Sequence, residues 1–422
     1  MRRTRIGTAV LAALVPGGAV PAEEADPPSP GWIELERPFT PDATRAFYPA
    51  ALSGDGHVVV GREWYSDTED GLGVSRAAVW NRGSLSWLVE PSRSANVPAH
   101  AVAYAISDDG SVIGGLSSLP NPPARMLTGA CAWYDGTPLH LQSLSGVQPA
   151  FVTGVNGTGT TFVGRALVAG GGSAAYVMRL GVLELLEPLN GAAGDATAVS
   201  VSDDGRTVVG FSTNEDGVDE AVRWVDGEVE ALGVLPWWAT ASYATDVNRD
   251  GNVIVGRIMA NGVAMHFRWK GGHYEILEGL EPIGPVNVPY ARTVRTNADG
   301  TVIVGGFNDR AFYWTAPAGV RPLRTVAIES GIAVPCCTRF LNALDVSDDG
   351  RTILVRGRGR DLVITLGRDP VPGDANGDRR VDLQDLNMLL SSFGSGSSDG
   401  DLNGDGVVDL QDMNVLLQQF GT

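Results

Sequence analysis

The sequence predicts an all-β seven-bladed β-propeller followed by a small α-helical domain. Three observations lead to this fold class. A glycine-ended turn recurs at nearly constant spacing, each unit between turns holds four short strand patterns, and the composition changes after residue 369. The 422-residue chain is 43% hydrophobic, which is enough to bury a sizeable core.

The recurring turn is a run of Ser, Asn, Asp and Gly residues that ends on glycine. Successive glycines lie 54, 49, 46, 46, 49 and 50 residues apart. Seven units of nearly one length indicate a repeat architecture. The seven glycines are Gly56, Gly110, Gly159, Gly205, Gly251, Gly300 and Gly350.

The unit at residues 196–232 shows the internal plan most clearly. ATAVSVS, TVVGF, EAVRW and EVEAL each have the pattern of a short strand, and Asp-Gly pairs separate the first from the second and the third from the fourth. Asp-Gly between β-branched runs predicts a hairpin, because the tight turn needs a positive φ that glycine adopts at little cost. Four antiparallel strands per unit are the blade of a β-propeller.

A tryptophan on the third strand repeats with the same period. A leucine follows it eight residues later in four units and nine residues later in a fifth. We expect these tryptophans to pack between neighbouring blades rather than to bind a ligand. They are Trp80, Trp133, Trp224, Trp269 and Trp314, and in the third unit Val177 or Met178 takes their place.

The last unit lacks a fourth strand. RTILVRG and LVITL follow Gly350, and the composition then changes at Asp369 and Pro370. Residues 31–35, GWIEL, precede the first complete unit and have the pattern of an isolated strand. Pairing this strand with the last unit would close the ring and leave no open sheet edge. We therefore expect residues 31–369 to form the propeller, with a split last blade closed by residues 31–35.

The units carry an A-x-x-W-x-x-G-x-x-x-x-L signature, visible as AVWNRGSLSWL, AVRWVDGEVEAL and HFRWKGGHYEIL. This pattern resembles the extracellular repeat of the HAF family over roughly residues 31 to 369. The resemblance implies the architecture. It implies no particular biochemical activity.

The C-terminal segment contains two related acidic loops. DANGDRRVDLQDLNMLLSSFG begins at residue 374, and DLNGDGVVDLQDMNVLLQQFG follows 27 residues later. In a calcium loop, oxygen ligands occupy positions 1, 3, 5, 9 and 12, with a backbone carbonyl at position 7. The first loop supplies Asp374, Asn376, Asp378, Arg380 through its carbonyl, Asp382 and Asp385. The second supplies Asp401, Asn403, Asp405, Val407 through its carbonyl, Asp409 and Asp412.

Each acidic loop runs into a helical pattern, and neither loop is preceded by one. The expected apolar face consists of Leu383, Leu386, Leu390 and Phe393 in the first helix, and Leu410, Met413, Leu417 and Phe420 in the second. Residues 370–422 therefore resemble a type I dockerin, the module that binds cohesin domains. The resemblance implies two calcium ions held by the loop residues above. It also implies that a cohesin partner is recognised by the residues at the start of each helix, which are Leu383, Gln384, Leu410 and Gln411.

The N-terminus predicts export. Arg2, Arg3 and Arg5 precede an apolar run that ends in small residues, so residues 1–22 are interpreted as a secretory signal peptide and residues 23–30 as a linker. We thus expect a secreted protein, extracellular or associated with the cell surface.

The three cysteines leave the disulfide pairing open. Cys131 pairs with Cys336 or Cys337, or the adjacent two pair with each other, or all three are buried thiols.

The charge of −18 argues against nucleic-acid binding, and no known catalytic motif is present. Three Asp pairs occupy the same hairpin in their blades, so they are interpreted as turn formers rather than as paired acids for glycoside cleavage. They are Asp108 with Asp109, Asp203 with Asp204, and Asp348 with Asp349.

We expect the ligand-binding residues on the face opposite the Asp-Gly turns, where the loops differ between units. Aromatic residues in these loops suit stacking on a sugar ring or a protein surface: Trp64, Tyr65, Trp237 and Trp238. The favoured interpretation is a secreted, non-catalytic binding protein that its calcium-loaded dockerin attaches to a cohesin-bearing partner or surface. A polysaccharide is one candidate ligand. The alternative is a dockerin-borne carbohydrate-active enzyme, a glycoside hydrolase or lyase.

Overall fold

The computed structural model consists of two compact units, Met1–Leu366 and Gly367–Thr422, which are described separately. The structure describes residues 30–35, 45–66, 73–91, 100–119, 128–141, 147–169, 171–191, 194–234, 236–260, 263–277, 294–307, 309–334, 338–367, 381, 383–394, 408–418 and 420. The proposed signal peptide, Cys336 and Cys337 lie outside these residues.

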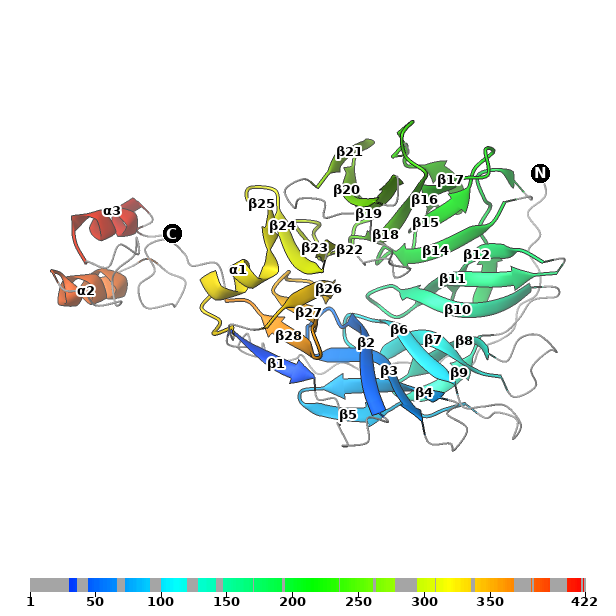
Figure 1. The fold of residues 1–422 in the computed structure, drawn as a ribbon, viewed down its shortest axis with the longest axis horizontal. Helices are drawn as coiled ribbons and strands as arrows, with labels where there is room; N and C mark the ends of the chain where they lie inside the picture. The colour runs from blue at the N-terminus through cyan, green and yellow to red at the C-terminus, as the bar shows by residue number, and fades with distance from the viewer. Residues whose placement is uncertain are drawn as a thin grey trace. The chain divides into compact units, whose positions relative to one another are not determined.

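The first unit is a seven-bladed β-propeller, as the repeat predicts, and each blade is a four-stranded antiparallel sheet (Figure 1). Blade 1 comprises β2 (Arg45–Leu52), β3 (Val58–Ser66), β4 (Gly73–Asn81) and β5 (Ser84–Trp87). Blade 2 comprises β6 (Ala101–Ile106), β7 (Val112–Ser118), β8 (Thr128–Tyr134) and β9 (Thr137–His140). Blade 3 comprises β10 (Val147–Val155), β11 (Thr161–Val168), β12 (Ser173–Arg179) and β13 (Val182–Leu185).

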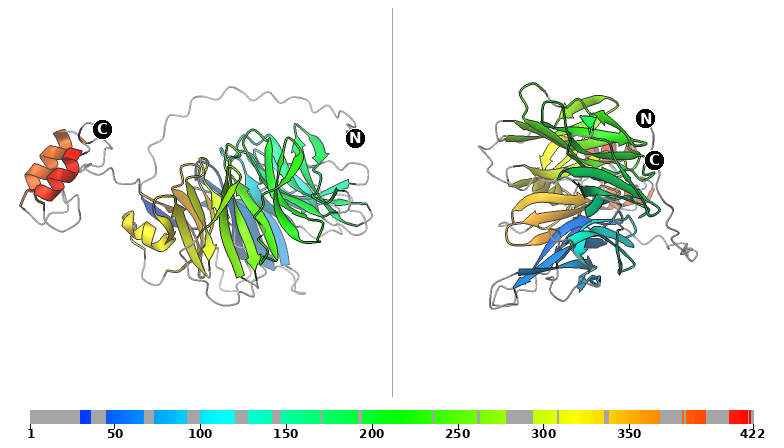
Figure 2. Two further views of the ribbon diagram at one scale, coloured as in Figure 1. Left: turned by 90° about the horizontal axis from the view of Figure 1, so that it is seen from above. Right: turned by 90° about the vertical axis from the view of Figure 1, so that its right-hand side faces the viewer.

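The remaining blades follow the same order. Blade 4 comprises β14 (Ala196–Val201), β15 (Thr207–Thr213), β16 (Asp219–Val225) and β17 (Glu228–Ala231). Blade 5 comprises β18 (Ala241–Val247), β19 (Val253–Ala260), β20 (Val263–Lys270) and β21 (His273–Ile276). Blade 6 comprises β22 (Val294–Thr296), β23 (Val302–Phe307), β24 (Arg310–Thr315) and β25 (Gly319–Pro322), which leads directly into helix α1 (Leu323–Glu329). The left view of Figure 2 shows α1, the yellow helix, at the edge of the propeller.

Blade 7 is assembled from both ends of the propeller sequence. It comprises β26 (Phe340–Val346), β27 (Thr352–Gly357), β28 (Asp361–Thr365) and, as its outer strand, β1 (Gly31–Leu35). Strand β1 pairs antiparallel with β28, with Leu35 opposite Asp361. Leu35 is almost fully buried and joins the core between blades 7 and 1. The N-terminal strand therefore occupies the position that the incomplete last unit leaves vacant.

The hairpin between the first two strands is built by a buried Ser or Asn at its first position. In blade 4, the Ser202 hydroxyl donates to Asp204 Oδ1 at 2.7 Å and accepts the Thr207 N–H at 3.0 Å, while Gly205 has a φ of 70°. In blade 5, Asn248 Oδ1 replaces the hydroxyl and accepts the Val253 N–H at 2.8 Å. The side-chain oxygen of either residue accepts a hydrogen bond from the same backbone amide. The turn therefore keeps its geometry whether its first residue is Ser or Asn.

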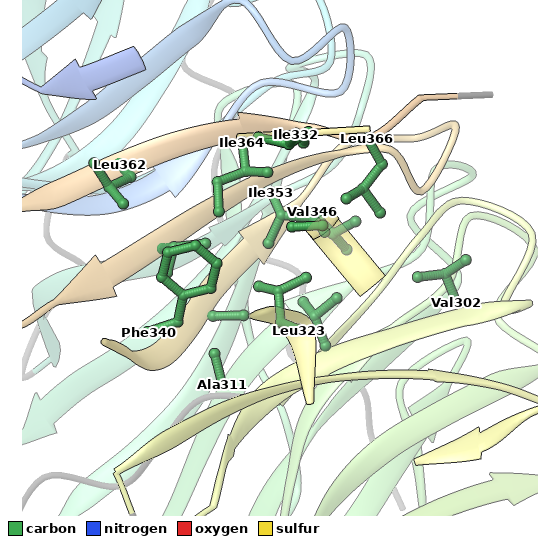
Figure 3. Close-up of a cluster of buried hydrophobic side chains, with 14 residues drawn as sticks. Val302, Ala311, Leu323, Ile332, Phe340, Val346, Ile353, Leu362, Ile364 and Leu366 are labelled. Atoms are coloured by element: carbon green, nitrogen blue, oxygen red, sulfur yellow. The ribbon is translucent and has the colours of Figure 1, made fainter. Parts of the chain in front are cut away.

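The hydrophobic core is divided among the interfaces between blades. The tryptophans pack there as expected, and the indoles of Trp133 and Trp224 donate to carbonyls of the preceding blade unit, those of Val89 and Glu187, at 2.8 Å each. The register places Met178 opposite Phe162, as Trp133 lies opposite Ile113, so Met178 occupies the tryptophan position in blade 3. Between blades 6 and 7, helix α1 adds Leu323 and Ala327 to the core, and Figure 3 shows Leu323 among the strand side chains.

The second unit contains helices α2 (Leu383–Ser392) and α3 (Leu410–Gln418). Its buried core consists of two pairs related by a shift of 27 residues, Val381 with Val408 and Leu389 with Leu416. Leu386 and Met413 pack against this core.

The buried side of these helices therefore does not coincide with the expected apolar face. The buried stripe runs through Asp385 and Leu389 in α2, one position away from the predicted stripe. Six of the eight predicted side chains are exposed: Leu383, Leu390, Phe393, Leu410, Leu417 and Phe420. The reason is that each of the two short helices buries the side on which it packs against the other.

Candidate axial binding site

A cavity of about 140 Å³ lies where the innermost strands of all seven blades meet. Residues of β2, β6, β10, β14, β18, β22 and β26 line it. Six of these strands have a break in register beside the cavity, for example between Ala244 and Asp246 and between Ala343 and Asp345. A bulge re-aims the side chain that follows it, so the residue after the break enters the cavity lining.

One end of the cavity is formed by the turns between first and second strands. Each turn contributes one residue, and backbone hydrogen bonds connect neighbouring turns, such as Asp348 N–H to the Gly54 carbonyl at 2.8 Å and Asp203 N–H to the Arg249 carbonyl at 3.0 Å. The equivalent residues in the seven blades are Gly54, Asp108, Gly157, Asp203, Arg249, Ala298 and Asp348. We call these seven residues the turn ring.

Arg249 connects three carboxylates across the turn ring. Its Nε lies 2.6 Å from Asp203 Oδ2, and its Nη2 lies 2.7 Å from Asp108 Oδ2 and 2.5 Å from Asp348 Oδ2. Burial, together with the neighbouring Asp108 charge, raises the pKa of Asp348 to about 6. Burial likewise raises the pKa of Asp108. One guanidinium thus faces three acids, and the turn ring is acidic overall.

A second polar group lies three residues before the turn ring, within the innermost strands that lead into it. Asp246 accepts the Ser200 hydroxyl at 2.7 Å and the Thr296 N–H at 3.0 Å. Asp345 Oδ2 accepts the Leu52 N–H at 2.8 Å, and the Arg295 Nε lies 3.9 Å from its Oδ1. Burial raises the pKa of Asp246, and it raises the pKa of Asp345 to about 6. The cavity therefore contains buried carboxylates that a cation or a hydrogen-bond donor would stabilise.

The interpretation of the Asp pairs as turn formers holds for one member of each pair and is wrong for the other. The second residue builds the turn, as Asp109 does by accepting the Ser107 hydroxyl at 2.7 Å. The first residue, such as Asp108, points across the turn ring to Arg249. The sequence carried one signal for this, because VNRDG has an arginine where three other turns have aspartate.

The structure does not bring the four predicted ligand-binding aromatic residues into one site. Trp64 lies in β3 of blade 1, and Trp237 and Trp238 lie in the connection from blade 4 to blade 5. Trp237 is 95% exposed, so it does not cap the core between blades, and Trp238 is 37% exposed. The backbone of Tyr65 pairs with Arg45 and Val74, and its side chain lies outside the described residues.

The predicted calcium loops are described only in part. Asp374, Asn376, Asp378, Arg380, Asp382, Asp401, Asn403, Asp405 and Val407 lie outside the described residues. Asp385 and Asp412 are described and fully buried, and Asp412 Oδ2 accepts the Asp409 N–H at 2.8 Å. Within the described ranges, no group of three or more His, Cys, Asp or Glu side chains is arranged to hold a metal ion. The four predicted partner-binding residues, Leu383, Gln384, Leu410 and Gln411, are all exposed.

Two further features bear on the sequence predictions. Cys131 is a free, buried thiol in β8, and burial raises its pKa to about 12, so it acts as a small apolar residue. Among the described residues, no helix is long and apolar enough to cross a membrane.

No protein-family model and no curated protein match the chain. Solved structures of similar fold include TolB from Acinetobacter baumannii, with 13% identity, a TM-score of 0.41, and coverage of 74% of this chain and 65% of TolB. An oligogalacturonate lyase in complex with manganese has 13% identity, a TM-score of 0.48, and coverage of 81% and 98%. An acylaminoacyl peptidase has 12% identity, a TM-score of 0.47, and coverage of 80% and 53%. These likenesses concern the propeller fold alone.

Proposed function

We propose that the protein is an exported binding protein in two functional parts. The propeller recognises a ligand, and the C-terminal unit is a calcium-dependent dockerin that attaches it to a cohesin-bearing partner. The observation that carries this proposal is the burial of Asp385 and Asp412, the residues at position 12 of the two predicted calcium loops.

Position 12 of a calcium loop supplies a carboxylate ligand, and these two carboxylates are the ones that the acidic loop pattern places at that position. Asp385 and Asp412 each lie in the first turn of their helix, and they are related by the same 27-residue shift as the core pairs. The unit is therefore consistent with two equivalent calcium sites.

The exposed apolar side chains of the two helices support a docking role. Leu383 and Leu390 lie seven residues apart on α2, as do Leu410 and Leu417 on α3, and each is more than half exposed. Residues seven apart share one face of a helix. An exposed leucine stripe on each helix is typical of a protein interaction surface.

The proposal is tested with the full-length mature chain and a panel of immobilised type I cohesins. Capture should require calcium and be lost on chelation. The double variant Leu383→Asp, Leu410→Asp should lose capture but keep both calcium ions, whereas Asp385→Ala should lose capture together with one calcium ion. Capture by no cohesin in calcium, with two ions bound, would contradict the attachment role.

One observation favours a second candidate, a glycoside hydrolase or lyase acting at the turn ring. A carboxylic acid with a pKa of about 6, as for Asp348, suits general acid catalysis near neutral pH. A screen of polysaccharides that measures product release beside binding separates the two candidates. Turnover that disappears in Asp348→Asn would favour the enzyme.

A further inference from the structure

Four arginines recur at one position of the second strand, six residues after the turn glycine. The register shows their equivalence, because each lies opposite the first-strand residue eight positions before the turn glycine. They are Arg62 in β3, Arg165 in β11, Arg257 in β19 and Arg356 in β27, and they lie opposite Tyr48, Phe151, Tyr243 and Asn342. We call these four residues the arginine belt. It lies toward the end of the inner strands that is remote from the turn ring.

Three members of the arginine belt have no acidic partner within the described part of the chain. Arg62, Arg165 and Arg257 make no ion pair there, and the Nε atoms of Arg165 and Arg257 are buried without a hydrogen-bond acceptor. Arg356 differs, because its Nε lies 3.6 Å from Asp361 Oδ1.

Several arginines elsewhere in the propeller are paired with acids. Arg206 pairs with Asp226 at 2.6 Å, and Arg223 and Arg321 pair with glutamates at the same distance. Such pairing is expected in a chain with 49 acidic and 31 basic residues. A half-buried guanidinium without an anion is costly. The unpaired members of the arginine belt therefore indicate an anion that binds from outside the chain.

Aromatic rings accompany the arginines. The Arg62 guanidinium lies 5.4 Å from the centre of the Tyr48 ring, and that of Arg257 lies 4.6 Å from the Tyr243 ring. Tyr104 meets Phe151 edge to face at 6.3 Å. Tyr48 and Tyr104 each expose 37% of their surface. A cation beside a partly exposed aromatic face suits a ligand that has both negative groups and apolar ring faces.

We propose that the arginine belt binds an acidic oligosaccharide. Its carboxylate or sulfate groups would pair with Arg62, Arg165 and Arg257, and its sugar rings would lie against Tyr48 and Tyr104. The proposal rests on the proposed role of the propeller as the ligand-binding part. A single-stranded nucleic acid offers similar chemistry, so binding of a single-stranded DNA is one outcome of the test below.

Calorimetric titration of the full chain tests the ligand class with four probes: oligomers of a polyuronate, their methyl esters, a sulfated glycan of similar length, and oligo-dT. At least one of the two acidic glycans should bind, more weakly as salt is raised, and the neutral esters should not. The acidic glycan that binds identifies the charged group. Equal binding of acid and ester, tighter binding of oligo-dT, or no binding of either acidic glycan would overturn the proposal.

Two substitutions locate the site. Arg165→Leu places leucine where blade 2 already has Leu116, and it should weaken acidic-glycan binding about tenfold or more. Its melting temperature without ligand should be no lower than that of the wild type, because an uncompensated buried charge is removed. The matched control Arg206→Gln, an exposed turn residue, should bind as the wild type does. Unchanged binding by Arg165→Leu would refute the site.

Arg62→Lys provides a variant that keeps the charge. Because lysine lacks the planar fork of the guanidinium, binding should weaken less than in Arg62→Gln. Equal loss in both variants, or loss in neither, would contradict pairing with the anion. Cohesin capture is measured on the same samples, so failure of this inference is distinguishable from failure of the attachment proposed above.

Discussion

Replacing Asp345 with Asn should remove a specific part of the pH dependence of propeller stability. Burial raises the pKa of this carboxyl from 3.8 to about 6 in the folded protein. The folded state therefore binds more protons than the unfolded state between about pH 4 and pH 6. The resulting stabilisation is fully present below the unfolded pKa and is lost as pH rises through 6.

The size of the effect follows from the shift. About two pKa units correspond to roughly 3 kcal/mol at most. Because 16% of the Asp345 side chain remains exposed, we expect about 2 kcal/mol. Asn at position 345 keeps an acceptor for the Leu52 N–H and carries no charge, so Asp345→Asn should match or exceed the wild-type stability at pH 7.5.

Urea unfolding between pH 4.5 and 7.5, followed by tryptophan fluorescence, measures the effect. All ten tryptophans lie between residues 32 and 314, so the signal reports the propeller alone. The free energy of unfolding should fall more steeply with pH in the wild type than in Asp345→Asn. The exposed turn variant Asp250→Asn should keep the wild-type slope. Equal slopes in Asp345→Asn and the wild type would refute this account of the buried carboxyl.

Three further predictions concern closure, the exposed aromatic link and calcium. Leu35→Ala should lower the free energy of unfolding by about 3 kcal/mol in urea titration, because Leu35 is buried between blades 7 and 1; a loss below about 1 kcal/mol would contradict closure by β1. Trp237→Ala should change stability by less than about 0.5 kcal/mol while Trp224→Ala costs about 4 kcal/mol, since only the latter is buried. Comparable losses in both would show that Trp237 is structural. Calorimetry should count two calcium ions in the wild type and one fewer in either Asp385→Ala or Asp412→Ala, and an unchanged count would refute these ligands.

The architecture of the propeller could be predicted because its determinants are local and repeated. Each hairpin is specified within a few residues by a buried Ser or Asn and a glycine at positive φ, as Ser202 and Gly205 show. Seven copies of that signal then fix the number of blades. Helix α1 was not predicted, because a seven-residue helix gives too short an apolar pattern to be recognised.

The turn ring could not be predicted in the same way. Asp108, Asp203 and Asp348 are 46 to 141 residues from Arg249 in sequence, and their hairpins look alike. Only closure of the ring brings the four side chains together. The position of the buried stripe on α2 was missed for a related reason, since burial in this unit depends on packing between the two helices rather than on helical spacing alone.

The charges of the turn ring and of the arginine belt arise from differences between residues at equivalent positions in the seven blades. In a propeller, one sequence position recurs on a circle, so a change in a single unit alters the charge of that circle without altering the strand pattern. The turn ring has three aspartates and Arg249, and the arginine belt has four arginines where the remaining blades have Leu116, Phe211 and Gly306. The uniform positions, such as the turn glycines, hold the blades together. Recognition is therefore to be sought at the positions where equivalent residues differ, and the arginine belt is the set of such positions that combines positive charge with exposed aromatic rings.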